Sequence, residues 1–204
     1  MAHNKFDIFS TPLVIESKMY TLKPEELDFI KSIPLRKTDN NSISKNIFVL
    51  ENKELSKLAK MIDYYIDGYV NNVLEINEKV KRTQSWLAVS KKGQSHHHHE
   101  HPNTFISAVF YVNCDSGDLV LKRQNSAIQD GFNFGFSIKK FNSSNCRKWN
   151  VPARTGDLVI FPGHITHYTT DNEHDDDRII LGVNYFISGE VGSLKTVDLI
   201  TIWK

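Results

Sequence analysis

The chain has 204 residues, of which 40% are hydrophobic and 24% charged, proportions typical of a globular protein. This composition excludes a disordered, collagen-like or disulfide-stapled chain. Because 25 basic residues stand against 24 acidic ones, the net charge of +1 gives no global field for nucleic acid or anionic lipid. Nucleic acid is therefore not expected as a partner, although a net charge near zero is compatible with a local basic patch.

The first 80 residues predict a strand followed by two helices. The strand covers residues 6–15, and the first helix runs over 22–33 with Thr21 as its N-cap and Pro24 in its first turn. Residues 36–46 are polar and predict a loop. A longer helix over 53–76 follows from apolar residues spaced by three and four: Leu55, Leu58, Ile62, Ile66, Tyr69 and Val73.

After residue 82 the pattern changes to short runs rich in Val, Ile, Phe, Thr and Tyr, separated by turn-forming residues. The predicted strands are 84–91, 104–113, 118–122, 132–141, 157–161, 178–187 and 196–203. The sequence thus predicts a mainly β jelly roll or sandwich with N-terminal helices covering one sheet face. We expect one domain over residues 1–204, in which residues 1–80 pack on a core formed by 81–204.

A run of histidines is the most unusual feature of the sequence. His96–His99 and His101 lie together, and two more histidines follow a predicted strand at His164 and His167. Since a strand presents alternate side chains on one face, pairs at 96/98, 97/99, 98/100 and 99/101 can each supply two metal ligands. A distal histidine about 66 residues later completes a facial triad suited to iron, zinc or copper. Adventitious metal binding by a solvated tract is the competing interpretation.

Arg178 follows His167 by 11 residues and opens another apolar strand. A buried guanidinium beside a metal site can hold a carboxylate through two parallel hydrogen bonds. A surface ion pair with one of the acidic residues 175–177 is the alternative. Trp86 and Trp149 can each either line a substrate pocket or pack in the core. The glycines at 117, 131 and 156 predict turns.

Three blocks of sequence resemble the 2-oxoglutarate and Fe(II)-dependent oxygenases, in particular a small type found in marine bacteria and phages. The blocks are Gln84–Val89 leading to the segment 99–113, then Gly156–His167, then Arg178–Phe186. The order of the blocks is more specific than any one of them, and the resemblance covers nearly the whole chain. It implies a double-stranded β-helix similar to that of the prolyl hydroxylases.

Carried over by position, the resemblance implies a role for each matched residue. His99, His101 and His167 would be the metal ligands. Tyr111 and Arg178 would hold the distal carboxylate of 2-oxoglutarate. Asn184 would face the metal and contact substrate or cosubstrate. The implied cofactors are Fe(II) and 2-oxoglutarate, and the implied reaction uses O2 to hydroxylate a C–H bond of an unknown primary substrate while 2-oxoglutarate becomes succinate and CO2.

One departure from the family pattern concerns the second ligand. The usual motif is His-x-Asp or His-x-Glu, whereas the frame that fits best here places His101 at the carboxylate position. A neutral third histidine would leave the iron site with one more positive charge and alter its redox behaviour. A second frame, His98 with Glu100, restores the carboxylate but shifts the register by one residue and turns Tyr111 to the other face.

Two other functions stay open at this stage. One is a cupin-like metalloprotein with three histidines and no 2-oxoglutarate, and the other is a structural jelly roll without catalysis. Cys114 and Cys146 have no metal or redox spacing and predict free thiols. The chain has neither a signal-peptide pattern nor an apolar run of membrane-spanning length, so an intracellular protein without a membrane partner is expected, in the host cytoplasm if it is viral. The C-terminal strand could pair across a homodimer or close a sheet edge.

Overall fold

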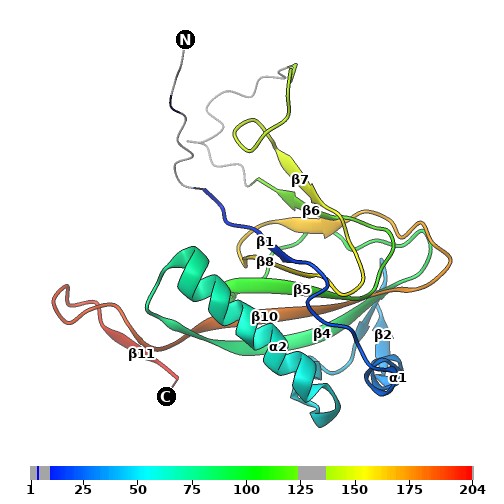
Figure 1. Ribbon diagram of the computed structural model, residues 1–204, viewed down its shortest axis with the longest axis horizontal. Coiled ribbons are helices and arrows are strands. Elements are labelled where there is room, and N and C mark those ends of the chain that lie inside the picture. The colour runs from blue at the N-terminus through cyan, green and yellow to red at the C-terminus, as the bar shows by residue number, and fades with distance from the viewer. Residues whose placement is uncertain (1–3, 5–9, 124–136, 204) are drawn as a thin grey trace.

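The computed structural model describes residue 4 and residues 10–123 and 137–203, which form a larger and a smaller β-sheet with helices on one side (Figure 1). The larger sheet has eight strands in one connected set. In spatial order they are β1 (Val14–Glu16), β8 (Leu158–Pro162), β5 (Ile106–Asn113), β10 (Arg178–Val191), β4 (Lys79–Ser90), β3 (Ser42–Ser44) and β2 (Leu35–Lys37), with β11 (Ile200–Ile202) paired to β10.

The smaller sheet lies above the larger one in Figure 1 and contains three described strands. Its central strand is β6 (Leu119–Lys122), which pairs antiparallel with β7 (Lys148–Val151) on one side and β9 (His167–Thr169) on the other. The predicted mainly β architecture is therefore confirmed.

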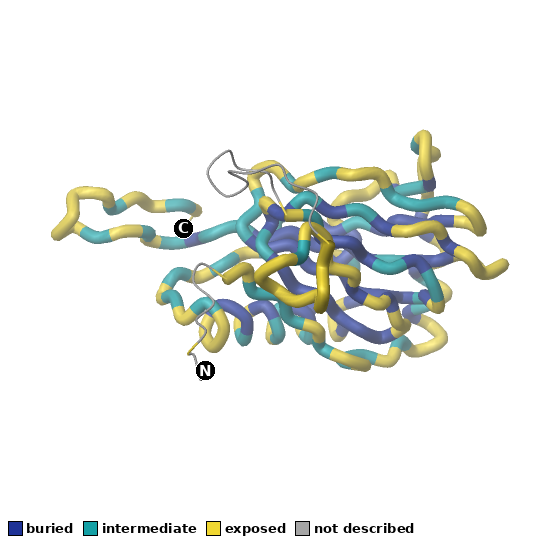
Figure 2. Tube along the Cα trace, turned by 90° about the horizontal axis from the view of Figure 1, so that it is seen from above, coloured by how far each residue is buried: buried dark blue, intermediate teal, exposed yellow. Residues whose placement is uncertain are grey.

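Two apolar cores hold these layers together. One packs the helices against the larger sheet, through residues such as Leu58, Ile62 and Leu181. The other lies between the sheets and includes Val109 of β5 and Leu119 of β6. Strands β5 and β10 are buried on both faces along most of their lengths, which accounts for their largely apolar sequences, and β4 is buried in its second half (Figure 2).

The helices are α1 (Pro24–Ser32) and α2 (Ser56–Gly68), with short helical turns η1 (Val49–Glu51) and η2 (Lys53–Leu55) before α2 and a π-helical segment η3 (Tyr69–Leu74) after it. The prediction that Thr21 caps α1 is wrong. The N-cap is Lys23, whose backbone N–H donates to the Glu26 side chain at 2.8 Å. Glu26 at position N3 thus accepts from the N–H of the cap residue, which is one half of a capping box; the lysine side chain cannot supply the reciprocal acceptor.

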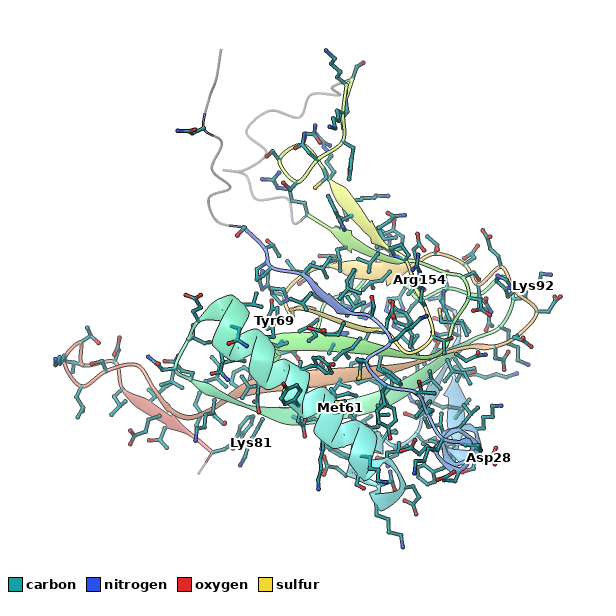
Figure 3. All side chains as sticks on the ribbon, viewed as in Figure 1. Asp28, Met61, Tyr69, Lys81, Lys92 and Arg154 are labelled. Carbon is teal, nitrogen blue, oxygen red and sulfur yellow. The ribbon has the colours of Figure 1, made fainter. Side chains whose placement is uncertain are left out.

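The predicted apolar stripe on α2 is buried as far as Tyr69, whereas Val73 is 43% exposed. The change to a π-helix after Gly68 explains this difference, because wider turns rotate later residues away from the stripe. The hydroxyl of Tyr69 donates to the carbonyl of Pro12 at 3.0 Å and ties the end of α2 to the N-terminal segment (Figure 3).

Three strand predictions need correction. Residues 36–46 are not a loop throughout, because β2 and β3 pair there as a hairpin at the sheet edge. Of the strand expected over 132–141, residues 132–136 lie outside the described residues and 137–141 are not a strand. The short strands β7 and β9 were not predicted, since both have too few residues to show a period of two.

Strand β10 connects the whole larger sheet. It pairs with β4 along eleven positions and with β5 along seven, and its far end forms a hairpin with β11 that projects from the molecule (Figure 2). Within the described part of the chain, no helix has the length and apolar character to cross a membrane.

Candidate metal centre

Three histidines from two separate segments meet in a cavity between the sheets. His99 and His101 lie in the connection from β4 to β5, and His167 is the first residue of β9. Their candidate ligand nitrogens all lie within 4.8 Å of one another. Among the described residues they form the one group of three or more His, Cys, Asp or Glu close enough to hold a single metal ion.

Backbone hydrogen bonds fix this meeting point. The N–H of His99 donates to the carbonyl of His167 at 3.0 Å, and the N–H of His167 returns to the carbonyl of His99 at 2.9 Å. The N–H of His101 donates to the carbonyl of Gly163 at 3.3 Å. The connection between two strands of the larger sheet is thereby attached to the smaller sheet, which holds the backbones of the three histidines close together.

The second ring nitrogen of each histidine has an oxygen acceptor. Nδ1 of His99 faces the carbonyl of His97, and Nδ1 of His167 faces that of Ile165, both at 2.8 Å. Nδ1 of His101 lies 2.8 Å from Asn184 Oδ1 and from the hydroxyl of Ser107. Since a carbonyl oxygen can only accept, each Nδ1 carries the proton and each Nε2 presents a lone pair.

The free Nε2 atoms point at one another, and those of His99 and His101 are 3.1 Å apart. Burial lowers the pKa of His101 to about 4 and that of His167 to about 3, and it also lowers the pKa of His99. All three rings are therefore neutral at pH 7. Converging lone pairs with no proton between them repel, and a divalent cation at this point would relieve that repulsion.

The second ligand frame is not assembled. Glu100 is exposed and accepts a hydrogen bond from the hydroxyl of Thr166 at 2.7 Å, and His98 stacks on Tyr168 with ring centroids 4.0 Å apart. His164 is also exposed and does not belong to the cluster. The geometry favours the frame with His101 in place of a carboxylate.

His96 lines the same cavity but differs from the three clustered histidines. Its Nδ1 accepts a hydrogen bond from the side-chain amide of Asn41 at 2.7 Å, while Oδ1 of Asn41 accepts from the hydroxyl of Thr38. The Asn41 amide is thus oriented with its donor toward His96, and the proton of the neutral imidazole lies on Nε2. His96 is therefore a hydrogen-bond donor in the cavity wall.

Arg178, at the start of β10, is only 3% exposed. Its guanidinium donates to two carbonyls, those of Thr170 and Gly117, and to two hydroxyls, those of Thr169 and Ser90. Burial lowers its pKa. All four acceptors are neutral, and no described Asp or Glu forms an ion pair with it, so the surface ion-pair alternative is wrong. A buried cation without a counter-charge favours an anionic ligand.

Tyr111 faces the same cavity with an unsatisfied hydroxyl. The side chain is 1% exposed, and its oxygen has no hydrogen-bond partner among the described residues. Burial raises its pKa well above the ordinary value, so the hydroxyl keeps its proton. A buried polar atom without a partner costs about 1–3 kcal/mol, which a ligand with an acceptor oxygen would recover.

Two glycines make room for the cavity side chains. A Cβ at Gly117, whose φ is +86°, would collide with the Arg178 guanidinium, and one at Gly182 would lie 2.5 Å from the ring of Trp86. Trp86 lines the cavity and contacts His101 edge-on, with centroids 5.2 Å apart. The free space among these side chains is about 30 Å³.

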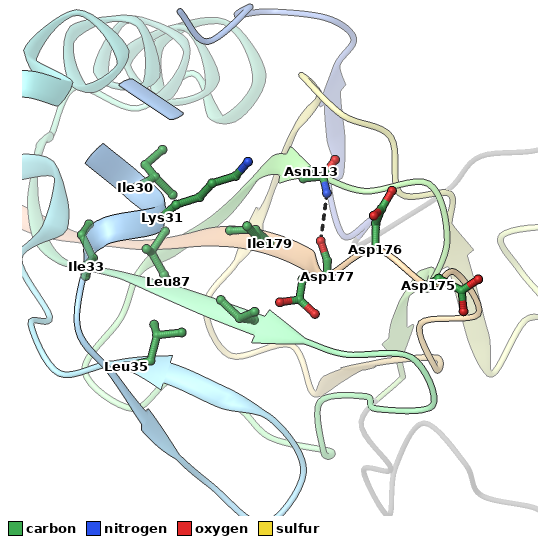
Figure 4. A pocket seen from close by; sticks show the side chains of 11 residues that line it. Ile30, Lys31, Ile33, Leu35, Leu87, Asn113, Asp175, Asp176, Asp177 and Ile179 are labelled. Atoms are coloured by element: carbon green, nitrogen blue, oxygen red, sulfur yellow. Dashed lines mark hydrogen bonds between the residues drawn. The ribbon is translucent and has the colours of Figure 1, made fainter. Parts of the chain in front are cut away.

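A larger cavity, of about 510 Å³, lies beside α1 and away from the histidines (Figure 4). Apolar side chains such as Ile30 and Ile179 form its base, and the acidic segment Asp175–Asp177 lies along its rim. Asn113 closes one side by donating to the carbonyl of Asp177 at 2.9 Å. Among the described residues that line it, this larger cavity has no set of converging metal ligands like that of the histidine cluster.

Several residues around the centre had no sequence signal or a different expected role. Asn184 was expected to contact substrate or cosubstrate, but its amide is 3% exposed and engages His101, Ser107 and Gln84. This arrangement favours a positioning role for Asn184. Ser107 could have been noticed as the polar member of an apolar strand. Asn41 gave no signal, because it lies in a segment interpreted as a loop.

Comparison with known proteins identifies the class to which this site belongs. Residues 84–184 match the family described as "Putative 2OG-Fe(II) oxygenase", and this region contains all three histidines, Tyr111, Arg178 and Asn184. The chain therefore belongs to the 2OG-Fe(II) oxygenase family, an oxidoreductase family. No curated protein matches the chain in sequence.

Solved structures show the same fold at low identity. An oxidoreductase of the 2OG-Fe(II) oxygenase family from Burkholderia pseudomallei is 12% identical, with a TM-score of 0.58 over 85% of this chain and 84% of that one. A Pseudomonas putida prolyl-4-hydroxylase is 12% identical, with a TM-score of 0.57 over 88% and 95%. HygX from Streptomyces hygroscopicus, solved with nickel and 2-oxoglutarate, is 12% identical, with a TM-score of 0.57 over 86% and 83%. The double-stranded β-helix is thereby confirmed.

Replacing Asn184 by Ala should weaken metal binding by about 10- to 100-fold, because His101 loses an acceptor that orients its ring. Calorimetric titration of the metal-free protein with Ni(II) measures this change. Ser188→Ala is the matched control, since Ser188 lies on the same strand and bonds to Lys79 away from the histidines. Equal Ni(II) affinity in wild type and Asn184→Ala would contradict the positioning role.

Proposed function

We propose that the protein is an Fe(II)-dependent oxygenase that couples the conversion of 2-oxoglutarate to succinate with hydroxylation of a C–H bond in a second substrate. His99, His101 and His167 would hold the metal through Nε2. Arg178 and Tyr111 would hold the distal carboxylate of 2-oxoglutarate. These assignments rest on the family, on the convergence of the ligand nitrogens and on the charge of the cavity.

The observation that carries the proposal is a pair of buried groups beside the histidine cluster, one with an uncompensated charge and the other with an unsatisfied hydroxyl. Arg178 is a buried cation with only neutral acceptors, and Tyr111 is a buried donor with none. Both line the cavity that contains His99, His101 and His167. A ligand carrying a carboxylate at one end and metal-binding oxygens at the other satisfies both ends at once, and 2-oxoglutarate has this chemistry.

The chain's own residues would position, orient and shield the reactants. Fe(II), when bound, supplies the oxygen chemistry that the side chains cannot perform. The Nδ1–H bonds of the three histidines keep their Nε2 lone pairs directed at one point. Arg178 fixes the cosubstrate by charge, and the Nε2–H of His96 can donate to a ligand oxygen between Arg178 and the cluster.

The narrowness of the cavity has a consequence for binding. Its free space of about 30 Å³ accommodates an ion or a water molecule but not 2-oxoglutarate. Side chains of the wall must therefore move when 2-oxoglutarate binds. Trp86 and the half-buried His96 are the candidates, because neither is fully enclosed. Closure of these side chains over the ligand would then exclude water from the metal.

The third histidine sets this site apart from the usual His-x-carboxylate pattern. Three neutral imidazoles leave the charge of Fe(II) undiminished, and Arg178 adds a further positive charge to the cavity. The charge of the iron and the charge of Arg178 both favour a cosubstrate with two negative charges, such as 2-oxoglutarate. The same charge would raise the reduction potential of the iron relative to a site with a carboxylate ligand.

Succinate formation tests the reaction directly. With Fe(II), air and 2-oxoglutarate, wild type should release succinate, and His167→Ala should release none because one metal ligand is lost. Arg178→Ala should need about 100-fold more 2-oxoglutarate, because a charge-assisted pair is removed. His164→Ala, at an exposed histidine in the same loop, is the control and should keep wild-type turnover. Succinate release that survives His167→Ala would contradict the assignment.

Tyr111→Phe separates a ligand-binding role from a structural one. Removing a hydroxyl that has no partner should leave the free energy of unfolding of the ligand-free protein unchanged or higher. The same substitution should weaken 2-oxoglutarate binding about fivefold, the loss of one hydrogen bond. Urea denaturation and calorimetry on the Ni(II)-loaded protein measure the two quantities. A less stable variant with unchanged 2-oxoglutarate affinity would overturn the role of Tyr111.

The homodimer is a separate proposal. The projecting hairpin of β10 and β11 exposes apolar side chains at Leu194 (80%), Val197 (91%), Ile200 (54%) and Trp203 (51%). Apolar exposure concentrated on one arm is typical of an association surface. The double substitution Leu194→Glu/Val197→Glu should convert a dimer into a monomer in sedimentation velocity. A wild type that sediments as a monomer at 100 µM, roughly the upper limit for a weak dimer of biological use, would end this proposal.

A further inference from the structure

The net charge of +1 is a sum over two oppositely charged parts of the chain. Residues 119–156 contain seven basic residues and one acidic residue, Asp130, a net charge of +6. The remaining residues therefore carry a net charge of −5. The basic segment contains β6 and β7, which form the smaller sheet together with β9. Nucleic acid was not expected as a partner because the net charge of the whole chain is close to zero, and that sum conceals the basic segment.

The register of the smaller sheet directs part of this segment toward the metal centre. Leu121 on β6 pairs with His167 on one side and with Trp149 of β7 on the other. Directly opposed residues in an antiparallel sheet share a face, so Trp149 lies on the same face as the proposed metal ligand. Two strand spacings separate them, about 10 Å.

Trp149 and Phe141 form an exposed aromatic pair on this face. Their ring centroids are 5.3 Å apart, and the residues are 39% and 53% exposed. Aromatic rings that remain exposed together at the end of a sheet offer a flat surface for stacking. They do not belong to either apolar core.

Basic residues flank the aromatic pair. The ladder continues beyond Leu121, where Arg123 donates its N–H to the carbonyl of Arg147 at 3.0 Å, so the period of two places both arginines on the face of Trp149. Lys148 alternates with Trp149 along β7 and lies on the opposite face of the sheet, over the ring of Tyr168 at 5.5 Å from its centroid. Lys139 and Lys140 precede Phe141 and are exposed. Figure 3 shows this end of the molecule standing away from α2.

We propose that this surface, made by Phe141, Trp149 and the four basic residues Arg123, Lys139, Lys140 and Arg147, binds single-stranded nucleic acid and presents it to the metal centre. The inference names the substrate class of the oxygenase and so rests on the proposed function. Phosphates would pair with the lysines and arginines, and a base would stack on Trp149. A single strand fits better than a duplex, because a reacting base must leave the stack to enter a narrow cavity. An acidic protein would use the charge but not the aromatic pair.

Fluorescence anisotropy with a labelled, mixed-sequence 15-nucleotide single-stranded DNA, and its RNA equivalent, tests the proposal. Wild type should bind, with affinity falling as salt rises. Trp149→Ala should weaken binding by about tenfold or more, since a stacked base is lost. Arg123→Glu should weaken binding and reduce the slope of log affinity against log salt by about one. Lys57→Glu, an exposed lysine on α2, makes the same charge change away from the surface and should have no effect.

The outcomes separate this inference from the proposed function. Binding of 2-oxoglutarate to each Ni(II)-loaded variant shows that the variant is folded and reports on the metal centre alone. Nucleic-acid binding without 2-oxoglutarate binding would contradict the proposed function but support the surface. No binding by wild type, or binding insensitive to Trp149→Ala, would overturn the surface. Equal binding of poly-glutamate, also insensitive to Trp149→Ala, would assign the surface to an acidic protein instead.

Discussion

Two reciprocal backbone hydrogen bonds between His99 and His167 are the contact on which the site depends. They join the β4–β5 connection to the smaller sheet, so the backbones of two proposed ligand histidines are held beside each other, while the Nδ1–H bonds orient their rings. His101 follows two residues later and is held by its bond to Gly163. Without this bridge the histidine run would be a solvated loop, and the cavity would have no point at which three ring nitrogens converge.

The charge balance of the cavity follows from that arrangement. Neutral imidazoles surround the metal point, and the nearby Arg178 has no carboxylate partner among the described residues. The interior is thus cationic once a metal binds, at a depth where solvent screens poorly. A buried charge without a partner lowers the stability of the fold, so this arrangement is not explained by stability alone. In the proposed function the missing negative charge comes from the ligands that bind in the cavity.

Some features of the fold and of the candidate site could be predicted from the sequence, and others could not. The period-two pairing of His99 with His101, the distal His167 and the arginine at position 178 were visible as spacings. Spacing alone could not choose between Glu100 and His101, because both lie in register with a neighbouring histidine. The tertiary structure favours His101, because Glu100 turns outward and accepts a hydrogen bond from Thr166.

Other features had no local signal at all. Asn41 reaches His96 across 55 residues, and nothing in a polar segment marks which side chain does so. The hairpin of β2 and β3 was read as a loop because its residues are polar and lie at a sheet edge. The basic and aromatic surface was concealed by a net charge that averages over the chain. In each case the determining contact is long-range, whereas the sequence pattern is local.

Calorimetric titration of wild type with 2-oxoglutarate, in the presence and absence of a divalent metal under anaerobic conditions, tests the central claim most directly. If the histidine cluster binds metal and the cosubstrate contacts both metal and Arg178, one equivalent of 2-oxoglutarate should bind per chain. Its affinity should fall by about 100-fold or more, roughly the 3 kcal/mol of a strong charge-assisted contact, when the metal is removed. Absence of binding to the metal-loaded protein, or equal affinity with and without metal, would contradict the account.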